Sequence, residues 1–439
     1  MEMEIISSEK IKPFSPTPDH LKLYKISLLD QIIPPVFAPA VLYFAPDNSN
    51  SISQKIQILK DSLALTLSHF YPFAGVIKDA LSVDCSDDGL PFLVTKIKGQ
   101  ISNFLKSPDM QLINKLLPSE FSWNEGAGPG ANVGIIQLNY FECGGMAICV
   151  ILAHHITDAT TLCTFLKSWS ANARGCAEIV CPNYISQSVF PQKVAMQKES
   201  HLFYSLQQFL KVGKFVTKRY VFDAAAISNL KSQSKNDEHH TRVEIVSAFI
   251  WKCFILAVGN EKSSNGEKKP FLLTQPVNLR RRAEPNFPEG CFGNFIWLAA
   301  AKWTFNSMDM ELKELVNEVK RAMSKIDKEF VKNLQGENGY YESFEGFKKG
   351  IPEEANWFAL SSWSKIGLYD VDFGWGRPVW LSGFVSGDLE SVLPNSATLM
   401  ETRSGDGIEA WVILDEKYVE GFENNEELNK YACFNPSAW

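Results

Sequence analysis

The sequence has no hydrophobic run long enough to cross a membrane. Its longest uninterrupted apolar stretch, Met146–Ala153, is far shorter than the roughly 20 residues that a membrane-spanning helix requires. The amino-terminal residues Met1–Lys10 are acidic and contain no signal-peptide core. These absences predict a soluble protein of the cytosol that does not use a membrane as a partner.

The sequence also lacks any C-x-x-C pair, and its cysteines are odd in number. The nine cysteines stand at positions 85, 143, 149, 163, 176, 181, 253, 291 and 433. An odd set without paired spacing is typical of free thiols, and it disfavours both a structural zinc site and a secreted disulfide framework. We therefore expect a reducing compartment and no bound metal.

There is no excess of positive charge either. The chain has 43 Lys and Arg against 50 Asp and Glu, a net charge of −7, which argues against nucleic acid as the main partner. Hydrophobic residues make up 45% of the chain and include 30 Phe and 11 Trp, as in a packed globular protein. Because 439 residues are about three times a typical domain, we expect two sizeable cores.

Several common catalytic motifs are missing. The sequence has no G-x-S-x-G elbow, no G-x-x-x-x-G-K-[ST] phosphate loop and no G-x-G-x-x-G after a strand. Serine hydrolases, P-loop nucleotide hydrolases and dinucleotide-dependent oxidoreductases therefore lose support.

The first part of the chain mixes helix and strand patterns. Apolar residues at helical spacing predict one helix over 52–67 and another that begins close to Asp158. Short runs rich in β-branched residues predict strands over 81–85, 92–98, 132–140 and 146–153, the last fully buried.

The periodic signal weakens between residues 174 and 215, which suits a crossover between two domains. Beyond it, the patterns predict a strand ending near Phe222, helices over 223–232, 241–256 and 308–334, a polar loop over 260–269, and strands around 380–385 and 409–414. The expected organisation is an amino-terminal domain over 1–180, a linker over 181–215 and a carboxy-terminal domain over 216–439.

His154 is the strongest candidate for a catalytic residue. It stands where the predicted strand 146–153 meets the following helix, so rigid backbone would hold a side chain that still faces a cleft. A neutral imidazole with an ordinary pKa of about 6.5 can take up a proton near neutral pH and return it. An ordinary buried or loop histidine explains this stretch equally well when the stretch is read alone.

Asp158 opens the amphipathic helix and is a favoured N-cap, a role that needs no catalysis. Its carboxylate is also able to fix the loop of His154 by pairing with a cation elsewhere. A metal site built from His154, His155 and Asp158 is disfavoured, because neighbouring histidines point apart and no H-x-x-x-H spacing is present.

A second distinctive string, Asp372-Phe-Gly-Trp-Gly376, is followed by Arg377. Two glycines around a tryptophan predict a tight turn, with Asp372 and Arg377 available for ion pairing. The string offers no base or nucleophile, so it favours a structural role. The arginines at 280–282 form a local basic cluster that either meets phosphates or lies in a solvated turn, and we expect a mixture of the two uses.

Taken together, these strings resemble the BAHD acyltransferases, a plant family that transfers an acyl group from coenzyme A to an alcohol or amine. His154–Asp158 fits the family's H-x-x-x-D motif, and Asp372–Gly376 fits its D-F-G-W-G motif without a substitution. Further similar segments are Leu21–Asp30, Ser68–Gly75, Phe141–Gly145, Thr241–Glu244, Asn278–Arg280 and Gly293–Asn294. The pattern, including Ala159 after the motif, is most like the vinorine-synthase-like branch, whose members mostly acetylate alkaloid and terpenoid alcohols.

The resemblance implies two similar-sized α/β domains of the chloramphenicol-acetyltransferase-like fold, with a solvent channel between them. Acyl-CoA, a co-substrate rather than a bound cofactor, would enter one mouth and a bulky small-molecule alcohol the other. His154 would be the general base that deprotonates the acceptor hydroxyl and then protonates the leaving thiolate, without a covalent acyl-enzyme. Asp158 would orient the loop by pairing with Arg280.

The resemblance also assigns supporting roles. Ser361 aligns with a position where relatives place a donor near the tetrahedral oxyanion. Asp372, Gly374, Trp375 and Gly376 would hold the fold from a distance. We expect a monomeric O-acetyltransferase that contains no metal. The alternatives are a malonyl or hydroxycinnamoyl transferase of the same family, a non-catalytic binding descendant, and a condensation-type domain that shares an H-H-x-x-x-D motif.

Overall fold

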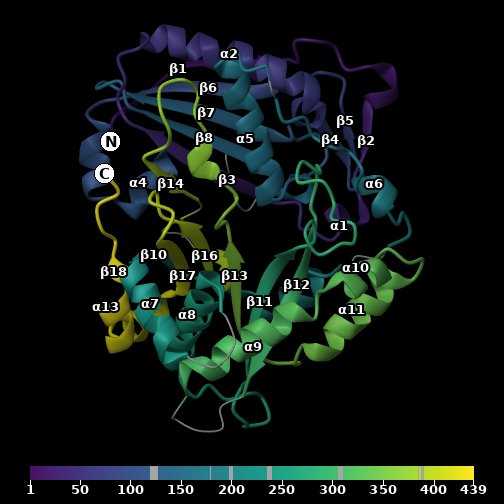
Figure 1. Cartoon of the computed structure of the whole chain (residues 1–439), viewed down its shortest axis with the longest axis vertical. Coiled ribbons are helices and arrows are strands. Elements are labelled where there is room, and N and C mark those ends of the chain that lie inside the picture. The colour runs from purple at the N-terminus through teal and green to yellow at the C-terminus, as the bar shows by residue number, and fades with distance from the viewer. Residues whose placement is uncertain are drawn as a thin grey trace.

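Two large β-sheets form the two halves of the molecule, one above the other in Figure 1. The structure is a computed structural model, and it describes residues 1–118, 127–177, 179–196, 201–234, 240–304, 310–383, 385–386 and 390–439. In spatial order, the upper sheet consists of β1 (Met3–Ile11), β6 (Leu90–Ile97), β7 (Gly134–Phe141), β8 (Met146–Ala153), β3 (Phe37–Phe44) and β14 (Trp380–Ser382).

Strand β8 carries the apolar run and lies in the interior of the upper sheet. It pairs antiparallel with β7 on one side and with β3 on the other, and all its residues are buried. Helices α2 (Ile52–His69) and α5 (Ala159–Ala173) cover the sheet face that is turned to the viewer in Figure 1. They pack on each other, and the indole of Trp169 in α5 donates to the Leu59 carbonyl oxygen of α2 at 3.0 Å.

The lower sheet belongs to the second core. In spatial order it consists of β12 (Ile296–Trp303), β11 (Phe271–Asn278), β13 (Asn356–Ser362), β16 (Asn395–Glu401), β17 (Ile408–Asp415), β10 (Phe215–Phe222) and β18 (Cys433–Phe434). Helix α8 (Arg242–Val258) begins with a capping box at Thr241 and Glu244, and it is buried over much of its length. It packs against α9 (Leu312–Ser324) and α12 (Glu416–Glu423).

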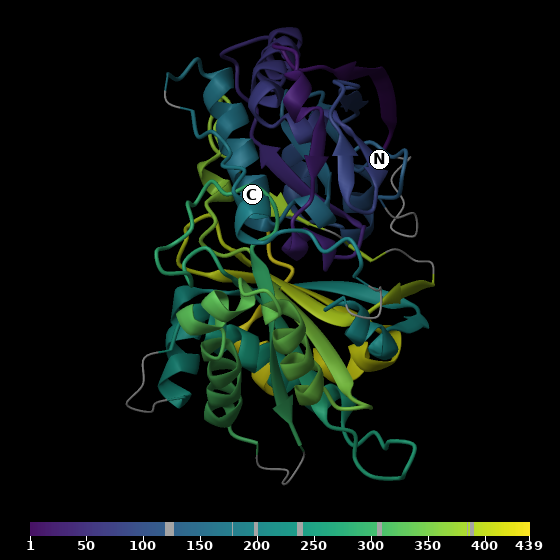
Figure 2. The ribbon, with the colours of Figure 1, turned by 90° about the vertical axis from the view of Figure 1, so that its right-hand side faces the viewer.

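Smaller elements complete the fold. One small sheet contains β2 (Leu23–Lys25), β5 (Ser82–Asp84) and β4 (Val76–Asp79), and another contains β15 (Ser391–Leu393) and β9 (Lys211–Gly213). The remaining helices are α1 (Leu28–Gln31), α3 (Ile101–Lys106), α4 (Met110–Lys115), α6 (Ser186–Val189), α7 (Ala224–Gln233), α10 (Lys328–Leu334), α11 (Gly339–Gly350) and α13 (Glu426–Tyr431). Figure 2 shows the same two halves stacked when seen from the side.

The two halves exchange segments. After β13 the chain leaves the lower sheet, and β14 pairs antiparallel with β3 at the edge of the upper sheet, so that Trp380 lies opposite Tyr43. Phe373 and Trp375 also belong to the upper core. In the other direction, Leu28 and Leu29 of α1 pack into the lower core. The predicted unit 216–439 therefore contains a stretch that folds with the upper sheet, because its aromatic side chains complete that core.

Most predicted elements occur close to their expected bounds. The predicted helix over 308–334 is instead two helices, α9 and α10, because Asp327 caps α10 by accepting from the Phe330 amide at 2.9 Å. Residues 308–309 of that prediction lie outside the described residues, as do residue 384 of the predicted strand 380–385 and residues 197–200 of the predicted linker. The polar loop over 260–269 is closed by an isolated antiparallel β-bridge between the backbones of Lys262 and Lys268.

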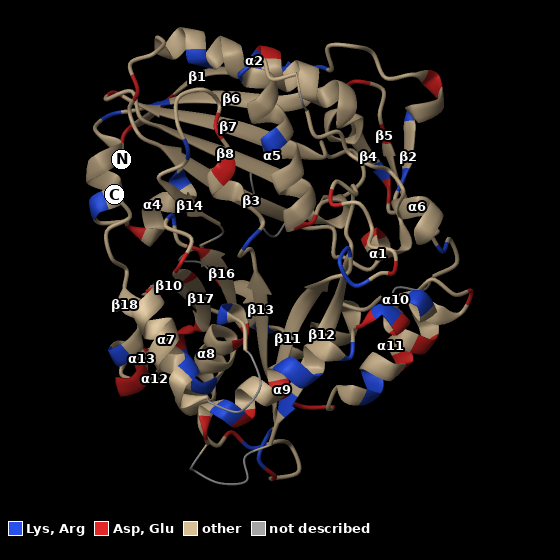
Figure 3. Ribbon diagram, viewed as in Figure 1, with Lys and Arg blue, Asp and Glu red and all other residues tan. Residues whose placement is uncertain are grey.

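Charged residues lie mainly on the outer helices. In Figure 3, acidic and basic segments alternate along α9, α10 and α11, while β3, β7 and β8 of the upper sheet contain no charged residue. Within the described residues, no helix combines the length and the hydrophobicity that crossing a bilayer requires.

Candidate active site

The loop between β8 and α5 carries His154 and lies where the two halves meet. The His154 amide donates to the Val36 carbonyl oxygen at 2.7 Å, and the Thr157 amide closes a short 3-10 turn onto the His154 carbonyl oxygen at 3.2 Å. Asp158 then caps α5 by accepting from the Thr161 amide at 2.8 Å. A buried strand on one side and a capped helix on the other thus fix the backbone at His154.

The His154 side chain borders a cavity of about 420 Å³ between the two halves. Its Nδ1 is enclosed and makes no hydrogen bond among the described residues, so Nε2 is the nitrogen that is left to face the cavity. Burial lowers the pKa of His154 below its usual value, because the surroundings cannot solvate an imidazolium. The imidazole is therefore neutral at physiological pH and free to accept a proton.

His155 does not share this position. It lines a different cavity, of about 510 Å³, bounded by the loop that follows α1 and by residues of the crossover such as Met196 and Phe203. Burial lowers its pKa to about 4. Because the two imidazoles open onto different cavities, they are not placed to hold one metal ion together.

A buried ion pair joins Asp158 to Arg280 across the two halves. Arg280 Nη1 lies 2.6 Å from Asp158 Oδ2, and Nη2 lies 3.2 Å from Oδ1, a bidentate arrangement in which the guanidinium is fully buried. Nη2 also donates to the carbonyl oxygens of Cys291 at 2.7 Å and Gly293 at 3.0 Å. Burial alone would raise the pKa of Asp158, but Arg280 and the donors around the carboxylate outweigh it and lower that pKa.

A second set of buried hydrogen bonds connects Asp30, through Asn294, to the loop that carries His154. Asn294 Nδ2 donates to the His154 carbonyl oxygen at 2.8 Å and to Asp30 Oδ1 at 2.9 Å. The Asn294 amide also donates to Asp30 Oδ1, at 2.7 Å. Burial raises the pKa of Asp30 to about 6 despite these donors. Gly293, at φ +104°, brings the chain so close that an added Cβ would lie 3.0 Å from the Asp30 carboxylate.

Sequence reasoning included Asp30 and Asn294 only as members of similar segments and gave neither a role. A local signal did exist for Asp30, since Ser27 and Asp30 form the capping box of α1. Nothing local to Asn294 indicates that its side chain donates to Asp30 and to His154. These residues stand 264 and 140 positions earlier in the sequence.

Hydroxyl groups line the cavity opposite His154. Ser361, on β13, donates to Thr398 Oγ1 on β16 at 3.2 Å, and both residues border the cavity. The apolar residues that line this cavity include Pro39, Ile296, Ile366, Leu393, Met400 and Trp411. Among the described residues that line it, there is no lysine or arginine.

The D-F-G-W-G string does not line this cavity. Asp372 Oδ1 accepts from the Gly374 amide at 2.8 Å and the Gly376 amide at 3.1 Å, and both glycines have positive φ. Phe373 packs edge-on against Trp169 of α5 at 4.8 Å between centroids. Arg377, which the sequence predicted to be available for ion pairing, has its Nη1 3.6 Å from Asp370 Oδ1. The motif is a turn that fastens the exchanged segment to the upper core.

The arginines at 280–282 are all engaged within the protein. Arg280 pairs with Asp158, Arg281 pairs with Glu289 at 2.6 Å, and Arg282 donates to the carbonyl oxygens at the end of α9. Arg280 is therefore structural, whereas Arg281 is well exposed, and a contact of this cluster with phosphates stays a prediction.

The fold and this site define a two-domain acyltransferase. Residues 1–429 match the Transferase family, and the chain belongs to that family, the BAHD acyltransferases. Its sequence and structure fit the vinorine-synthase-like branch.

Individual relatives agree with this placement. The chain is 39% identical to limonoid 7-O-acetyltransferase of Citrus sinensis, with 99% of each chain covered. It is 31% identical to vinorine synthase over the full length of both chains, with a TM-score of 0.81 between the structures. TRI101 of F. sporotrichioides, solved with coenzyme A and T-2, shares the fold at a TM-score of 0.75 and 17% identity, with 94% of this chain and 99% of that chain covered.

Proposed function

We propose that this protein transfers an acetyl group from acetyl-CoA to a hydroxyl group of a bulky plant specialised metabolite, a terpenoid or alkaloid alcohol. The observation that carries the proposal is a neutral, half-buried imidazole at His154 that borders a cavity between the two halves of a BAHD fold. The limonoid acetyltransferase relative favours a polycyclic terpenoid among these acceptors.

His154 acts as the general base in this proposal. Its Nε2 takes the proton of the acceptor hydroxyl while the oxygen attacks the thioester carbonyl carbon, which forms a tetrahedral oxyanion. As the intermediate collapses, the C–S bond breaks and the imidazolium returns the proton to the thiolate, giving the ester and free coenzyme A. Holding both substrates at one imidazole supplies proximity as well as base catalysis, and no covalent acyl-enzyme is needed.

Other residues support this step. Asp158, Arg280 and Asn294 hold the loop that carries His154, the first two through their ion pair and the third through the His154 carbonyl oxygen. In this proposal the Ser361 hydroxyl rotates away from Thr398 and donates to the oxyanion. A comparable donor stabilises the transition state by about 3 kcal/mol. Asp372, Gly374, Trp375 and Gly376 act only by fastening the fold.

The lining of the cavity favours a neutral acyl group. A malonyl group carries a carboxylate, and a buried carboxylate needs a cation or several donors to offset its lost hydration. The described residues around the cavity offer hydroxyl groups but no lysine or arginine. Acetyl transfer is therefore preferred over malonyl transfer.

We infer that the enzyme works in the cytosol as a monomer. All nine cysteines are free thiols in the structure. They include buried residues such as Cys85 and exposed residues such as Cys181. Free thiols suit a reducing compartment.

The test is a set of separate reactions with acetyl-, malonyl- and p-coumaroyl-CoA and a panel of limonoid and alkaloid alcohols. Release of free thiol reports on transfer, and mass spectrometry identifies the product. We expect an acetyl ester of at least one panel alcohol and little product from malonyl-CoA. A preference for malonyl-CoA would overturn the acyl-donor assignment, and thiol release without any acylated product would contradict the transfer itself.

The pH profile should report the lowered pKa of His154. Because burial lowers the pKa of His154 below its usual value of about 6.5, we expect kcat/KM to fall on the acid side with a midpoint below pH 6.5. The measurement is initial rate against pH at subsaturating acceptor, with folding checked by circular dichroism at each pH. An acid limb with its midpoint at or above 6.5 would contradict the assignment.

A further inference from the structure

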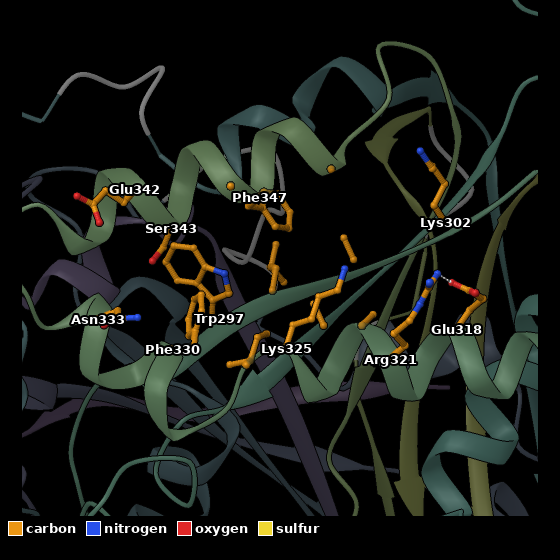
Figure 4. Close-up of a pocket in the computed structure, with 17 residues that line it drawn as sticks. Trp297, Lys302, Glu318, Arg321, Lys325, Phe330, Asn333, Glu342, Ser343 and Phe347 are labelled. Carbon is orange, nitrogen blue, oxygen red and sulfur yellow. Dashed lines mark hydrogen bonds and ion pairs between the residues drawn. The ribbon is translucent and has the colours of Figure 1, made fainter.

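A second cavity, of about 540 Å³, lies in the lower half away from His154. It is enclosed by the edge strand β12 and by helices α9, α10 and α11, and none of the site residues named above borders it (Figure 4). Its size is within the range that holds a small organic molecule. The proposed acetyl transfer gives this cavity no role.

One wall of the cavity is aromatic. Trp297 is 2% exposed and packs against Phe330 with ring centroids 5.4 Å apart. Phe347 of α11 closes the wall from above in Figure 4. A Cβ built at Gly346 or at Gly350 would meet no atom within 4 Å, so α11 leaves open space beside the rings. A flat apolar group fits against such a wall.

The lining combines donors at its centre with Asn333, Glu342 and Ser343 at one end. Figure 4 shows the indole nitrogen of Trp297 and the ammonium of Lys325 directed toward the same part of the cavity. Among the described residues, the Trp297 nitrogen contacts no acceptor, and neither Lys325 nor Lys302 takes part in an ion pair. Arg321 pairs with Glu318 at the rim. The lining thus holds three basic side chains, Lys302, Arg321 and Lys325, against the two acids Glu318 and Glu342, and together with the Trp297 N–H this balance favours an anion.

We propose that this cavity binds an organic anion that combines a flat apolar body with one carboxylate or sulfonate group. The body lies against Trp297, Phe330 and Phe347, and the acid group lies between the Trp297 N–H and the ammonium of Lys325. The remaining acid in the lining, Glu342, lies at the opposite end of the cavity in Figure 4 and disfavours a ligand with a second negative charge there.

Isothermal titration calorimetry with 2-naphthoate at 0.15 M salt tests the site, with uncharged 2-naphthamide as the matched ligand. We expect saturable binding of 2-naphthoate to the wild-type protein and binding at least tenfold weaker for 2-naphthamide. Lys325→Glu should weaken 2-naphthoate binding at least tenfold. The matched control is Lys348→Glu, because Lys348 is exposed on α11 and does not line the cavity. This variant should keep the affinity for 2-naphthoate within twofold of the wild type, since 0.15 M salt screens distant charges.

A second variant tests the cavity by volume instead of charge. Gly346→Leu places a side chain in the open space beside Phe347 and should abolish binding while the melting temperature stays close to that of the wild type. Absence of saturable binding to the wild-type protein would overturn the proposal. Equal affinity in the wild type and Lys325→Glu would overturn it too, because it would place the ligand elsewhere, for example in the cavity of His154. Acetyl transfer measured on the same variants tests the proposed function independently.

Discussion

Replacing His154 by alanine should lower kcat/KM for acetyl transfer by about 10²- to 10⁴-fold, the usual contribution of a positioned general base. The side chain borders the cavity between the two halves, and its carbonyl oxygen, which the substitution leaves in place, keeps its bond from Asn294. The fold should therefore survive, and thiol release under identical conditions measures the effect.

The neighbouring histidine provides the control for this experiment. His155 opens onto the other cavity, so His155→Gln should retain a rate within about tenfold of the wild type, far above that of His154→Ala. A near-normal rate in His154→Ala would disprove the proposed mechanism. Equal losses in both variants, with unchanged melting curves, would show that the assignment of the base to His154 alone is wrong.

Replacing Arg280 by methionine should destabilise the protein by about 3–5 kcal/mol, because it leaves the Asp158 carboxylate buried without its cation. The pair is enclosed, and the guanidinium also satisfies the carbonyl oxygens of Cys291 and Gly293. We expect a clear fall in the denaturant midpoint or in soluble yield, together with loss of activity.

The adjacent arginine is the matched control for this substitution. Arg281 makes an ion pair of the same length with Glu289, but both partners are well exposed, so Arg281→Met should cost no more than about 1 kcal/mol. In the double variant Arg280→Met/Asp158→Asn no lone charge remains, and part of the lost stability should return. Equal effects of Arg280→Met and Arg281→Met would refute the importance of the buried pair.

The elements that the sequence predicted well are those whose signal is local. The run 146–153 is a buried strand because every one of its residues is apolar, and Asp158 caps the next helix because a carboxylate before an amphipathic pattern has a nearby amide to accept from. The motif residues could be placed on these elements for the same reason.

The parts that the sequence did not predict depend on partners far along the chain. Periodicity identifies the buried face of a strand but not the sheet it joins, so nothing local shows that β14 pairs with β3. Three consecutive arginines look alike in a sequence, yet Arg280 is buried and Arg281 is well exposed. Only the fold distinguishes them.

The exchanged segments also bear on how the protein is made. When the first half of the chain leaves the ribosome, strand β3 has an open edge, and it stays open until β14 at Trp380–Ser382 has been synthesised. Leu28 and Leu29 likewise stay without their native contacts until the residues of the lower core have been synthesised. We therefore expect the packing of both halves to be completed only after Trp380–Ser382 have been synthesised, and a chain cut in the crossover to give fragments that need each other for their complete cores.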